Sequence, residues 1–185
     1  MDAMMKHSLV YYVSASLDGY IARPDGRVDW LEALAQPADD PGYQHFYDSV
    51  DGLLMGRATY EAQLARATAW PYAGKPCIVQ TRADLPLAAP NVRLSRSTPA
   101  AAIAELVGAG CRRIWLVGGG SLAGTCYAAG LLDELVVSLM PHLLGAGIPL
   151  FATGLERGLK LHEQRSFANG VVQLHYHLED ENAVA

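Results

Sequence analysis

Three consecutive glycines form the segment of this sequence best suited to bind a phosphate group. Gly118, Gly119 and Gly120 follow an apolar run and precede Ser121 and a helical pattern. Backbone N–H groups at a helix N-terminus carry partial positive charge and bind anions, and glycines let a pyrophosphate approach closely because no Cβ intervenes. The Ser121 hydroxyl can donate one more hydrogen bond. The segment predicts a phosphate-binding turn; the alternative is a tight strand-to-helix turn that binds nothing.

A second turn of the same kind lies earlier in the chain. The apolar run at residues 53–55 ends in Gly56, and a helical pattern follows with Arg57 and Thr59 in its first turn. Two strand–glycine–helix junctions can meet at the carboxyl ends of one parallel sheet, where open α/β folds bind ligands. The Arg57 guanidinium offers several donors to a phosphate, although an exposed arginine on a helix is the alternative. We therefore predict two phosphate-binding turns at one edge of a sheet.

The end of the next predicted strand carries Thr81 and Arg82. Arg82 can pair with the 2′-phosphate of NADP, because neither of its neighbours in sequence is acidic and would repel that phosphate. The alternative is an arginine in a solvated loop. This pair is a candidate for the adenosine end of a dinucleotide site.

The elements that would position these turns follow an alternating pattern. Strand-like and helix-like segments alternate, which indicates an α/β domain. We expect strands at residues 8–16, 52–55, 75–81, 92–94, 113–117 and 134–140, and helices at 41–47, 57–66, 99–107 and 121–129. Asp40 is the expected N-cap of the first helix. Residues 159–167 and 170–178 should form an antiparallel hairpin that turns at Asn169-Gly170, so we expect a mixed, mainly parallel sheet.

Length, charge and hydrophobicity exclude several classes of protein. The chain has 185 residues, a formal net charge of -5 and 51% hydrophobic residues, which suits one domain over residues 1–185. A nucleic-acid binder needs a basic face, and no apolar run reaches the roughly 20 residues of a membrane span. The first residues lack the apolar core of a signal peptide. We predict a cytoplasmic protein that binds a small-molecule substrate and neither nucleic acid nor membrane.

The spacing of cysteine and histidine predicts no metal site. The three cysteines are widely spaced: Cys77, Cys111 and Cys126. They form no C-x-x-C pair and no zinc-type Cys/His pattern, so we expect buried thiols and no bound metal. The histidines considered as ligands are His45 on a helix, and His175 and His177, which alternate on the last strand. All three are expected at the surface.

Four motifs occur in an order typical of one family. They are S-L-D-G-Y-I-A at residues 16–22, M-G-R-A-T-Y-E at 55–61, V-G-G-G-S-L at 117–122 and L-L-G-A-G-I-P-L-F at 143–151. With them the chain resembles the dihydrofolate-reductase-like superfamily, and more closely the reductase C-terminal domain of the bacterial bifunctional deaminase-reductase of riboflavin biosynthesis and its stand-alone relatives. The resemblance implies a three-layer α/β fold with a mixed, mainly parallel central sheet, NADPH as hydride donor, and often a homodimer.

The resemblance also implies roles for the matched residues. Contacts to the cofactor phosphates would come from Gly56, Arg57 and Thr59, and contacts near the adenosine from Thr81 and Arg82. The pyrophosphate would be wrapped by Gly118, Gly119, Gly120, Ser121 and Leu122. The loop from Ala15 to Ile21 would lie against the nicotinamide and the substrate.

Three residues are candidates for the substrate end. The resemblance places Asp18 toward the substrate, where it would orient the substrate or relay a proton; the alternative is a turn residue in an Asp-Gly pair. Tyr20 and Trp30 could stack on a flat ring, and each could equally belong to the packing. Asp18 is therefore the candidate catalytic residue.

Together these features predict an NADPH-dependent reductase that resembles 5-amino-6-(5-phosphoribosylamino)uracil reductase, with hydride transfer to a small heterocyclic or sugar-derived substrate. The P-C-x-x-C motif of the deaminase domain does not occur. Dihydrofolate reductase activity is an alternative, because Asp40 stands at a comparable distance before the M-G-R motif to the acid of folate reductases. The same turns would also suit a non-catalytic nucleotide- or flavin-binding module, and a structural dimer module would have turns that bind nothing.

Overall fold

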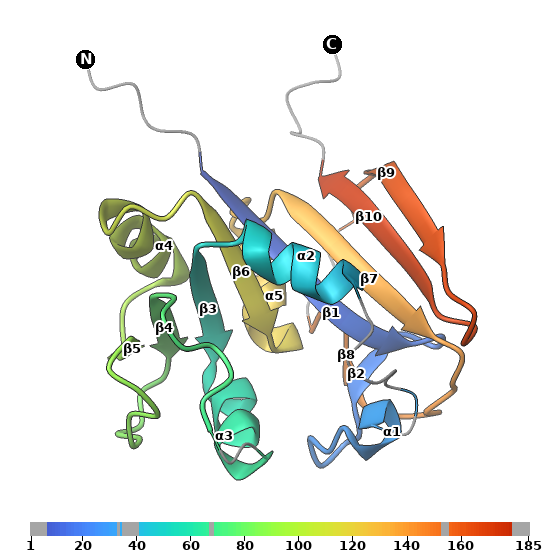
Figure 1. The fold of residues 1–185 in the computed structure, drawn as a ribbon, viewed down its shortest axis with the longest axis horizontal. Coiled ribbons are helices and arrows are strands. Elements are labelled where there is room, and N and C mark those ends of the chain that lie inside the picture. Colours follow the sequence, from blue (N-terminus) through green and yellow to red (C-terminus); the bar gives the residue numbers. More distant parts are fainter. Residues whose placement is uncertain (1–6, 33, 35–40, 67–68, 153–155, 179–185) are drawn as a thin grey trace.

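The computed structural model describes residues 7–32, 34, 41–66, 69–152 and 156–178 (Figure 1). The strands of the main sheet are β1 (Ser8–Ser16), β3 (Gly52–Gly56), β4 (Cys77–Gln80), β5 (Val92–Ser95), β6 (Arg113–Gly118), β7 (Glu134–Met140), β9 (Leu159–Ser166) and β10 (Val172–Leu178). A small ribbon is formed by β2 (Tyr20–Ala22) and β8 (Ile148–Pro149). The helices are α1 (Asp29–Glu32), α2 (Pro41–Ser49), α3 (Arg57–Arg66), α4 (Pro99–Gly108) and α5 (Gly120–Ala128). No helix within the described ranges has both the length and the apolar character to cross a membrane.

The strand order of the main sheet is β5-β4-β3-β6-β1-β7-β10-β9. β1 runs parallel to both of its neighbours, β6 and β7, and the pairs β3–β6, β3–β4 and β4–β5 are also parallel. β10 is antiparallel to β7 and to β9. The predicted mixed, mainly parallel sheet with antiparallel C-terminal strands is therefore confirmed. The carboxyl ends of its parallel strands share one edge.

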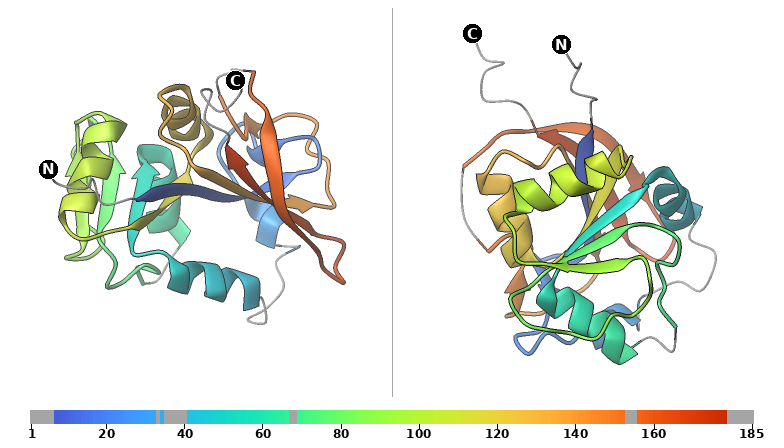
Figure 2. Two further views of the ribbon diagram at one scale, coloured as in Figure 1. Left: turned by 90° about the horizontal axis from the view of Figure 1, so that it is seen from above. Right: turned by 90° about the vertical axis from the view of Figure 1, so that its left-hand side faces the viewer.

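Helices cover both faces of the sheet because its central strands are apolar on both sides. In β1, Leu9 and Tyr11 belong to a core with α4 and α5, whereas Val10 and Tyr12 belong to a second core with α2 and α3. Side chains alternate along a strand, so a strand that is buried on both faces has a continuous apolar run. Figure 2 shows α5 and α2 on opposite sides of the sheet.

The bounds of most predicted elements agree with the structure to within two residues at each end. Three short elements, β2, α1 and β8, lie where no strand or helix was predicted. β2 has three residues, and its partner is β8, with Tyr20 opposite Pro149. A pairing between segments so far apart in sequence leaves no local pattern. Asp40, the predicted N-cap, lies outside the described residues.

The three cysteines are free and buried, as predicted. Burial raises the pKa of the Cys77 and Cys126 thiols to about 12. Because the thiolate is the form that attacks electrophiles and binds metals, these two thiols act as packing groups.

The C-terminal hairpin forms as predicted, with Gly170 at φ +86° in its turn. β9 is one of the two edge strands of the main sheet, and every one of its residues is exposed. His45 and His177 are exposed, as predicted. For His175 the prediction needs correction, because its side chain is only 19% exposed and its Nε2 lies 2.9 Å from a carboxylate oxygen of Glu134. Glu134 belongs to the neighbouring strand β7, so the pattern of β10 alone does not reveal this contact.

Gly120, the first residue of α5, packs so closely on β8 that it leaves no room for a side chain. A Cβ at this position would lie 2.2 Å from the Pro149 carbonyl oxygen. We predict that Gly120→Ala lowers the free energy of unfolding by roughly 1–3 kcal/mol, the usual cost of overpacking, measured by urea denaturation. The control Gly108→Ala places its Cβ in open space at the end of α4 and should be neutral or mildly stabilising. Equal midpoints for the two variants would contradict this packing.

Candidate functional site

The two glycine turns predicted from the sequence lie side by side. β3 and β6 are parallel neighbours, and their register sets Met55 opposite Gly118. A Cβ on Gly56 would lie 3.6 Å from the Gly118 carbonyl oxygen and 3.7 Å from the Gly119 nitrogen. Gly118 has φ +142°, a conformation that favours glycine, and Thr59 Oγ1 would lie 3.3 Å from a Cβ there. The ends of β3 and β6 therefore form one continuous surface, which we call the turn surface.

The N-terminus of α5 opens onto the turn surface. Gly119 is the N-cap of α5 and, as a glycine, offers no side-chain acceptor to the N–H groups of the first turn. The peptide bond between Gly118 and Gly119 is cis. The first N–H groups of a helix have no acceptor within the helix; in α5 these belong to Gly120, Ser121 and Leu122. The helix dipole adds partial positive charge at the same place. This arrangement suits an anion such as a pyrophosphate.

A cavity of about 990 Å³ includes the turn surface in its lining. Most residues predicted to contact a cofactor line it: Ile21, Gly56, Arg57, Thr59, Gly118, Gly119, Gly120, Ser121 and Leu122. Its volume is within the range of ligand and cofactor pockets. The structure thus brings both glycine motifs and the segment after β1 into one site.

Three other predicted cofactor residues lie outside the lining of this cavity. Ala15 is fully buried in the core with α5, and residues 13–14 line the cavity in its place. Thr81 is 8% exposed, and its hydroxyl accepts a hydrogen bond from the backbone two residues on. Arg82 is exposed beyond the end of β4, whose last residue, Gln80, does line the cavity. These three positions differ from the expectation because the pairing of a strand in the sheet decides which of its side chains face the cavity and which face the core.

Asp18 is held by the chain itself. Ser16 Oγ donates a hydrogen bond to Asp18 Oδ1 at 2.6 Å, and the N–H groups of Leu144 and Gly145 donate to its two oxygens at 3.1 and 2.7 Å. The Ser16 hydrogen bond is the main cause that lowers the pKa of Asp18 to about 2. Asp18 was expected to face the substrate, but it does not line the cavity. What the structure shows is a carboxylate that ties the turn after β1 to residues 144–145.

Tyr20 and Trp30, the candidates for stacking on a flat ring, also lie outside the cavity lining. Trp30 is 3% exposed and stacks on the ring of His142, with centroids 5.6 Å apart. Tyr20 packs on Gly147, where an added Cβ would lie 3.1 Å from the Tyr20 Cβ. Both residues therefore pack against other parts of the chain, which was the alternative to stacking on a bound ring.

Polar residues that no motif revealed also line the cavity. Gln173 Nε2 of β10 donates hydrogen bonds to Tyr12 Oη of β1 at 3.2 Å and to Ser138 Oγ of β7 at 3.1 Å. Tyr43 of α2 lines the cavity as well, and burial raises the pKa of its hydroxyl to about 12. The sequence offered one signal for Tyr12, Ser138 and Gln173, because each has a polar group among apolar neighbours in its strand. Which of these residues meet depends on the strand order.

The charged side chains that line the cavity, within the described part of the chain, both come from α3. Arg57 Nε donates to Glu61 Oε1 at 3.0 Å, and this bond leaves the terminal N–H groups of the guanidinium for another acceptor. Arg66 pairs with Glu32 of α1 at 2.8 Å, so an ion pair links the two helices. The rest of the described lining is uncharged.

Comparisons with known proteins agree with this geometry. The model of the RibD C-terminal domain matches residues 7–173. The uncharacterized protein YwjB of Bacillus subtilis (strain 168) is 35% identical over 173 residues, which are 93% of this chain and 98% of that protein. A solved structure from Shewanella sp. PV-4, named for riboflavin biosynthesis, is 29% identical with a TM-score of 0.83, covering 94% of this chain and 99% of the other.

A more distant solved structure shares the fold. It is the diaminohydroxyphosphoribosylaminopyrimidine deaminase/5-amino-6-(5-phosphoribosylamino)uracil reductase of Thermotoga maritima, with a TM-score of 0.71 and 14% identity. The match covers 94% of this chain and 57% of that one. This chain therefore corresponds to a part of the two-activity protein.

Asp18 should contribute stability that depends on pH. Its pKa of about 2 lies below the ordinary value of 3.8, so its contribution is present above about pH 4 and is lost as the pH falls toward 2. Asp18→Asn replaces one acceptor oxygen with an amide that cannot accept from the backbone. We predict a lower thermal midpoint for the variant at pH 7 and a difference that shrinks toward pH 2, followed by circular dichroism.

The matched control for this prediction is Asp84→Asn, at a side chain that is 95% exposed. It should follow the wild type closely at every pH. An Asp18→Asn difference that stays constant with pH, or that is absent at pH 7, would show that the carboxylate does not tie the two segments.

Proposed function

The chain belongs to the RibD C-terminal domain family, and from this premise we propose that it is an NADPH-dependent reductase. Its substrate would be a small heterocyclic or sugar-derived compound related to the 5-amino-6-(5-phosphoribosylamino)uracil of riboflavin biosynthesis. One observation carries the proposal: two glycine turns meet at the carboxyl ends of β3 and β6 and line a single large cavity. Open α/β sheets bind ligands at this edge.

The turn surface fits a dinucleotide. Side chains at Gly56 and Gly118 would fill the space over the turn, so glycine keeps it open for a pyrophosphate. The N–H groups of the first turn of α5 would bind the phosphate oxygens, and the hydroxyls of Thr59 and Ser121 and the free end of Arg57 would add donors. NADPH, when bound, supplies the hydride, while the protein holds and orients both reactants.

The preference for NADPH over NADH is assigned to Arg82. This arginine is exposed and follows β4, the strand next to β3. Its long side chain can turn toward a 2′-phosphate at the adenosine end of the site, and a guanidinium matches phosphate geometry. Thr81 would position this segment through its own backbone hydrogen bond.

The substrate half is assigned to the cavity wall formed by β1, β7 and β10. The linked side chains of Tyr12, Ser138 and Gln173 offer hydroxyl and amide groups that can orient a carbonyl or imine. Among the cavity-lining residues that the structure describes, there is no Asp, Glu, His or Lys. The hydroxyls of Tyr12 and Ser138, or water, would therefore deliver the proton that accompanies the hydride. Asp18 is a positioning residue in this scheme, because it fixes the turn after β1.

The charge distribution bears on the choice of substrate. The only cations in the described lining are Arg57 and Arg66, and both lie on α3. A phosphate dianion bound by uncharged aromatic and amide groups would lose its hydration without a counter-charge. We therefore expect that the dephosphorylated form of the uracil substrate is reduced at least as well as the phosphorylated one.

The cofactor assignment can be tested by thermal shift. At a hundredfold excess over Kd, NADPH should stabilise the wild type by about 2.7 kcal/mol. Arg57→Ala should weaken the shifts with NADPH and NADH alike, whereas Arg82→Ala should weaken only that with NADPH. Arg93→Ala is the matched control, because Arg93 is exposed and pairs with Glu105 away from the cavity. No shift with either dinucleotide would refute the reductase assignment.

The substrate half can be tested by following NADPH oxidation with both forms of the uracil substrate. Gln173→Leu should lower kcat/KM at least about tenfold, equivalent to ~1.4 kcal/mol, while the NADPH thermal shift is unchanged. Gln164→Leu on the exposed edge strand β9 is the control. Binding of NADPH without oxidation in the presence of any substrate would instead support a non-catalytic nucleotide-binding module.

A further inference from the structure

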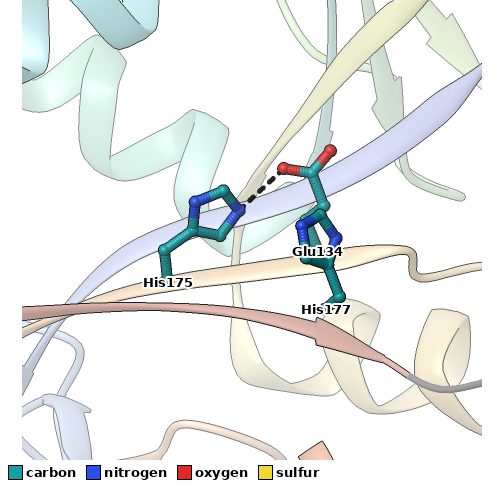
Figure 3. Close-up of side chains that lie close together, drawn as sticks. All are labelled: Glu134, His175 and His177. Atoms are coloured by element: carbon teal, nitrogen blue, oxygen red, sulfur yellow. Dashed lines mark hydrogen bonds and ion pairs between the residues drawn. The ribbon is translucent and has the colours of Figure 1, made fainter. Parts of the chain in front are cut away.

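A cluster of imidazoles and one carboxylate lies on the main sheet, separate from the cavity. His175 and His177 are two residues apart on β10, so their side chains share one face of the strand. Glu134 begins β7 and stands opposite His177 in the register. One ligand atom from each of the three residues lies within 4.8 Å of the other two. Figure 3 shows both rings rising from β10 toward the Glu134 carboxylate.

A third histidine joins the cluster from the edge strand. His162 occupies the point where the pairing of β9 with β10 shifts register, between the partners of His175 and Tyr176. The His162 ring centroid lies 4.9 Å from that of His175 and 4.8 Å from that of His177, and the latter two are 5.2 Å apart. Three imidazoles from two strands thus stand at nearly equal separations. The irregularity in the hairpin is what brings the third one in.

This donor set matches the preference of a specific class of ion. Imidazole nitrogen suits Zn²⁺, Cu²⁺ and Ni²⁺, whereas Mg²⁺ and Ca²⁺ prefer oxygen ligands. Glu134, His175 and His177 would supply three ligands of a tetrahedral zinc site, and His162, whose ring lies beside both other rings, is the candidate for the fourth. We propose that His162, His175, His177 and Glu134 form a binding site for one divalent transition-metal ion, although the spacing of these residues in the sequence predicted no metal site.

The contacts that Glu134 makes in the structure are compatible with a ligand role. Arg113 donates to both carboxylate oxygens, from Nη1 to Oε1 at 2.5 Å and from Nη2 to Oε2 at 2.8 Å, and Oε2 also lies 2.9 Å from His175 Nε2. Ligating carboxylates are commonly held by a second hydrogen bond of this kind. An ion that enters between His175 and Glu134 needs the lone pair of His175 Nε2, so a hydrogen on that nitrogen moves by way of the solvent to Nδ1 and the ring stays neutral. Arg113 would then keep the carboxylate in position.

The proposed site is accessible from the solvent. A bound ion would link the C-terminal hairpin, β9 and β10, to β7. His162 and His177 are exposed, so an ion can reach them from the solvent. None of the four residues lines the cavity, so the ion would act on the fold and take no part in hydride transfer. β9 is an exposed edge strand, and the ion would connect it and β10 to β7. An ion that binds the folded state alone stabilises it by RT ln(1 + [L]/Kd), so the stability rises with the ion concentration.

Titration of tag-free protein with ZnCl₂ or NiCl₂, followed by calorimetry and thermal shift, tests the proposal. We expect one ion per chain and a raised thermal midpoint, with no comparable effect of MgCl₂. His177→Ala and His162→Ala each remove an exposed ligand and should weaken binding at least about tenfold, a loss typical of damaged metal sites. His45→Ala removes an exposed histidine from α2 and should leave the affinity unchanged.

The same titration has outcomes that would overturn the proposal. These are an absence of saturable binding, equal affinity for Mg²⁺, or an affinity that neither His177→Ala nor His162→Ala changes. Circular dichroism of each variant without metal separates lost binding from lost folding. The NADPH thermal shift of these variants should match the wild type, since the cluster lies outside the cavity.

Discussion

The parallel pairing of β3 with β6 is the constraint on which the site depends. It sets the ends of two strands side by side, so that α3 and α5 begin at neighbouring points and direct their N-termini at the same space. At Gly118 the positive φ of +142° favours glycine, and a Cβ there would lie 3.3 Å from Thr59 Oγ1 of α3. Each helix N-terminus alone would be a weak anion site, whereas two adjacent ones combine their donors.

A second set of contacts holds the other side of the cavity. The Asp18 carboxylate accepts from the N–H groups of residues 144–145, and the Leu150 N–H donates to the Gly19 carbonyl at 2.9 Å. The Ala152 N–H donates to the Gly120 carbonyl at 3.1 Å, which connects this region to the start of α5. The two hydrogen bonds donated by Leu150 and Ala152 join backbone to backbone, so they hold these segments in place and require no side chain inside the cavity. Asp18 therefore matters for the site through the segments that it holds together.

One face of the sheet carries two polar pairs along β7 and β10. Near the cavity, Ser138 and Gln173 face the same side and bond to each other. Farther along the same strands, Glu134 and His175 face that side and bond in the same way. The repeat of two residues along each strand produces both pairs, since Leu174 lies on the opposite face with the core around α5. The polar positions of β7 and β10 thus meet across the two strands on one face of the sheet.

The sequence by itself determined the local elements and the two turns. Helices, strands and the Asn169-Gly170 turn depend on the conformational preferences of nearby residues, so the bounds of most of them could be predicted to within two residues. The tertiary structure decided which side chains meet. Asp18 has partners 126 and 127 residues away, and Gln173 bonds to a tyrosine 161 residues away. Strand order and register set these contacts, and both result from the packing of the whole sheet, which no local pattern of residues encodes.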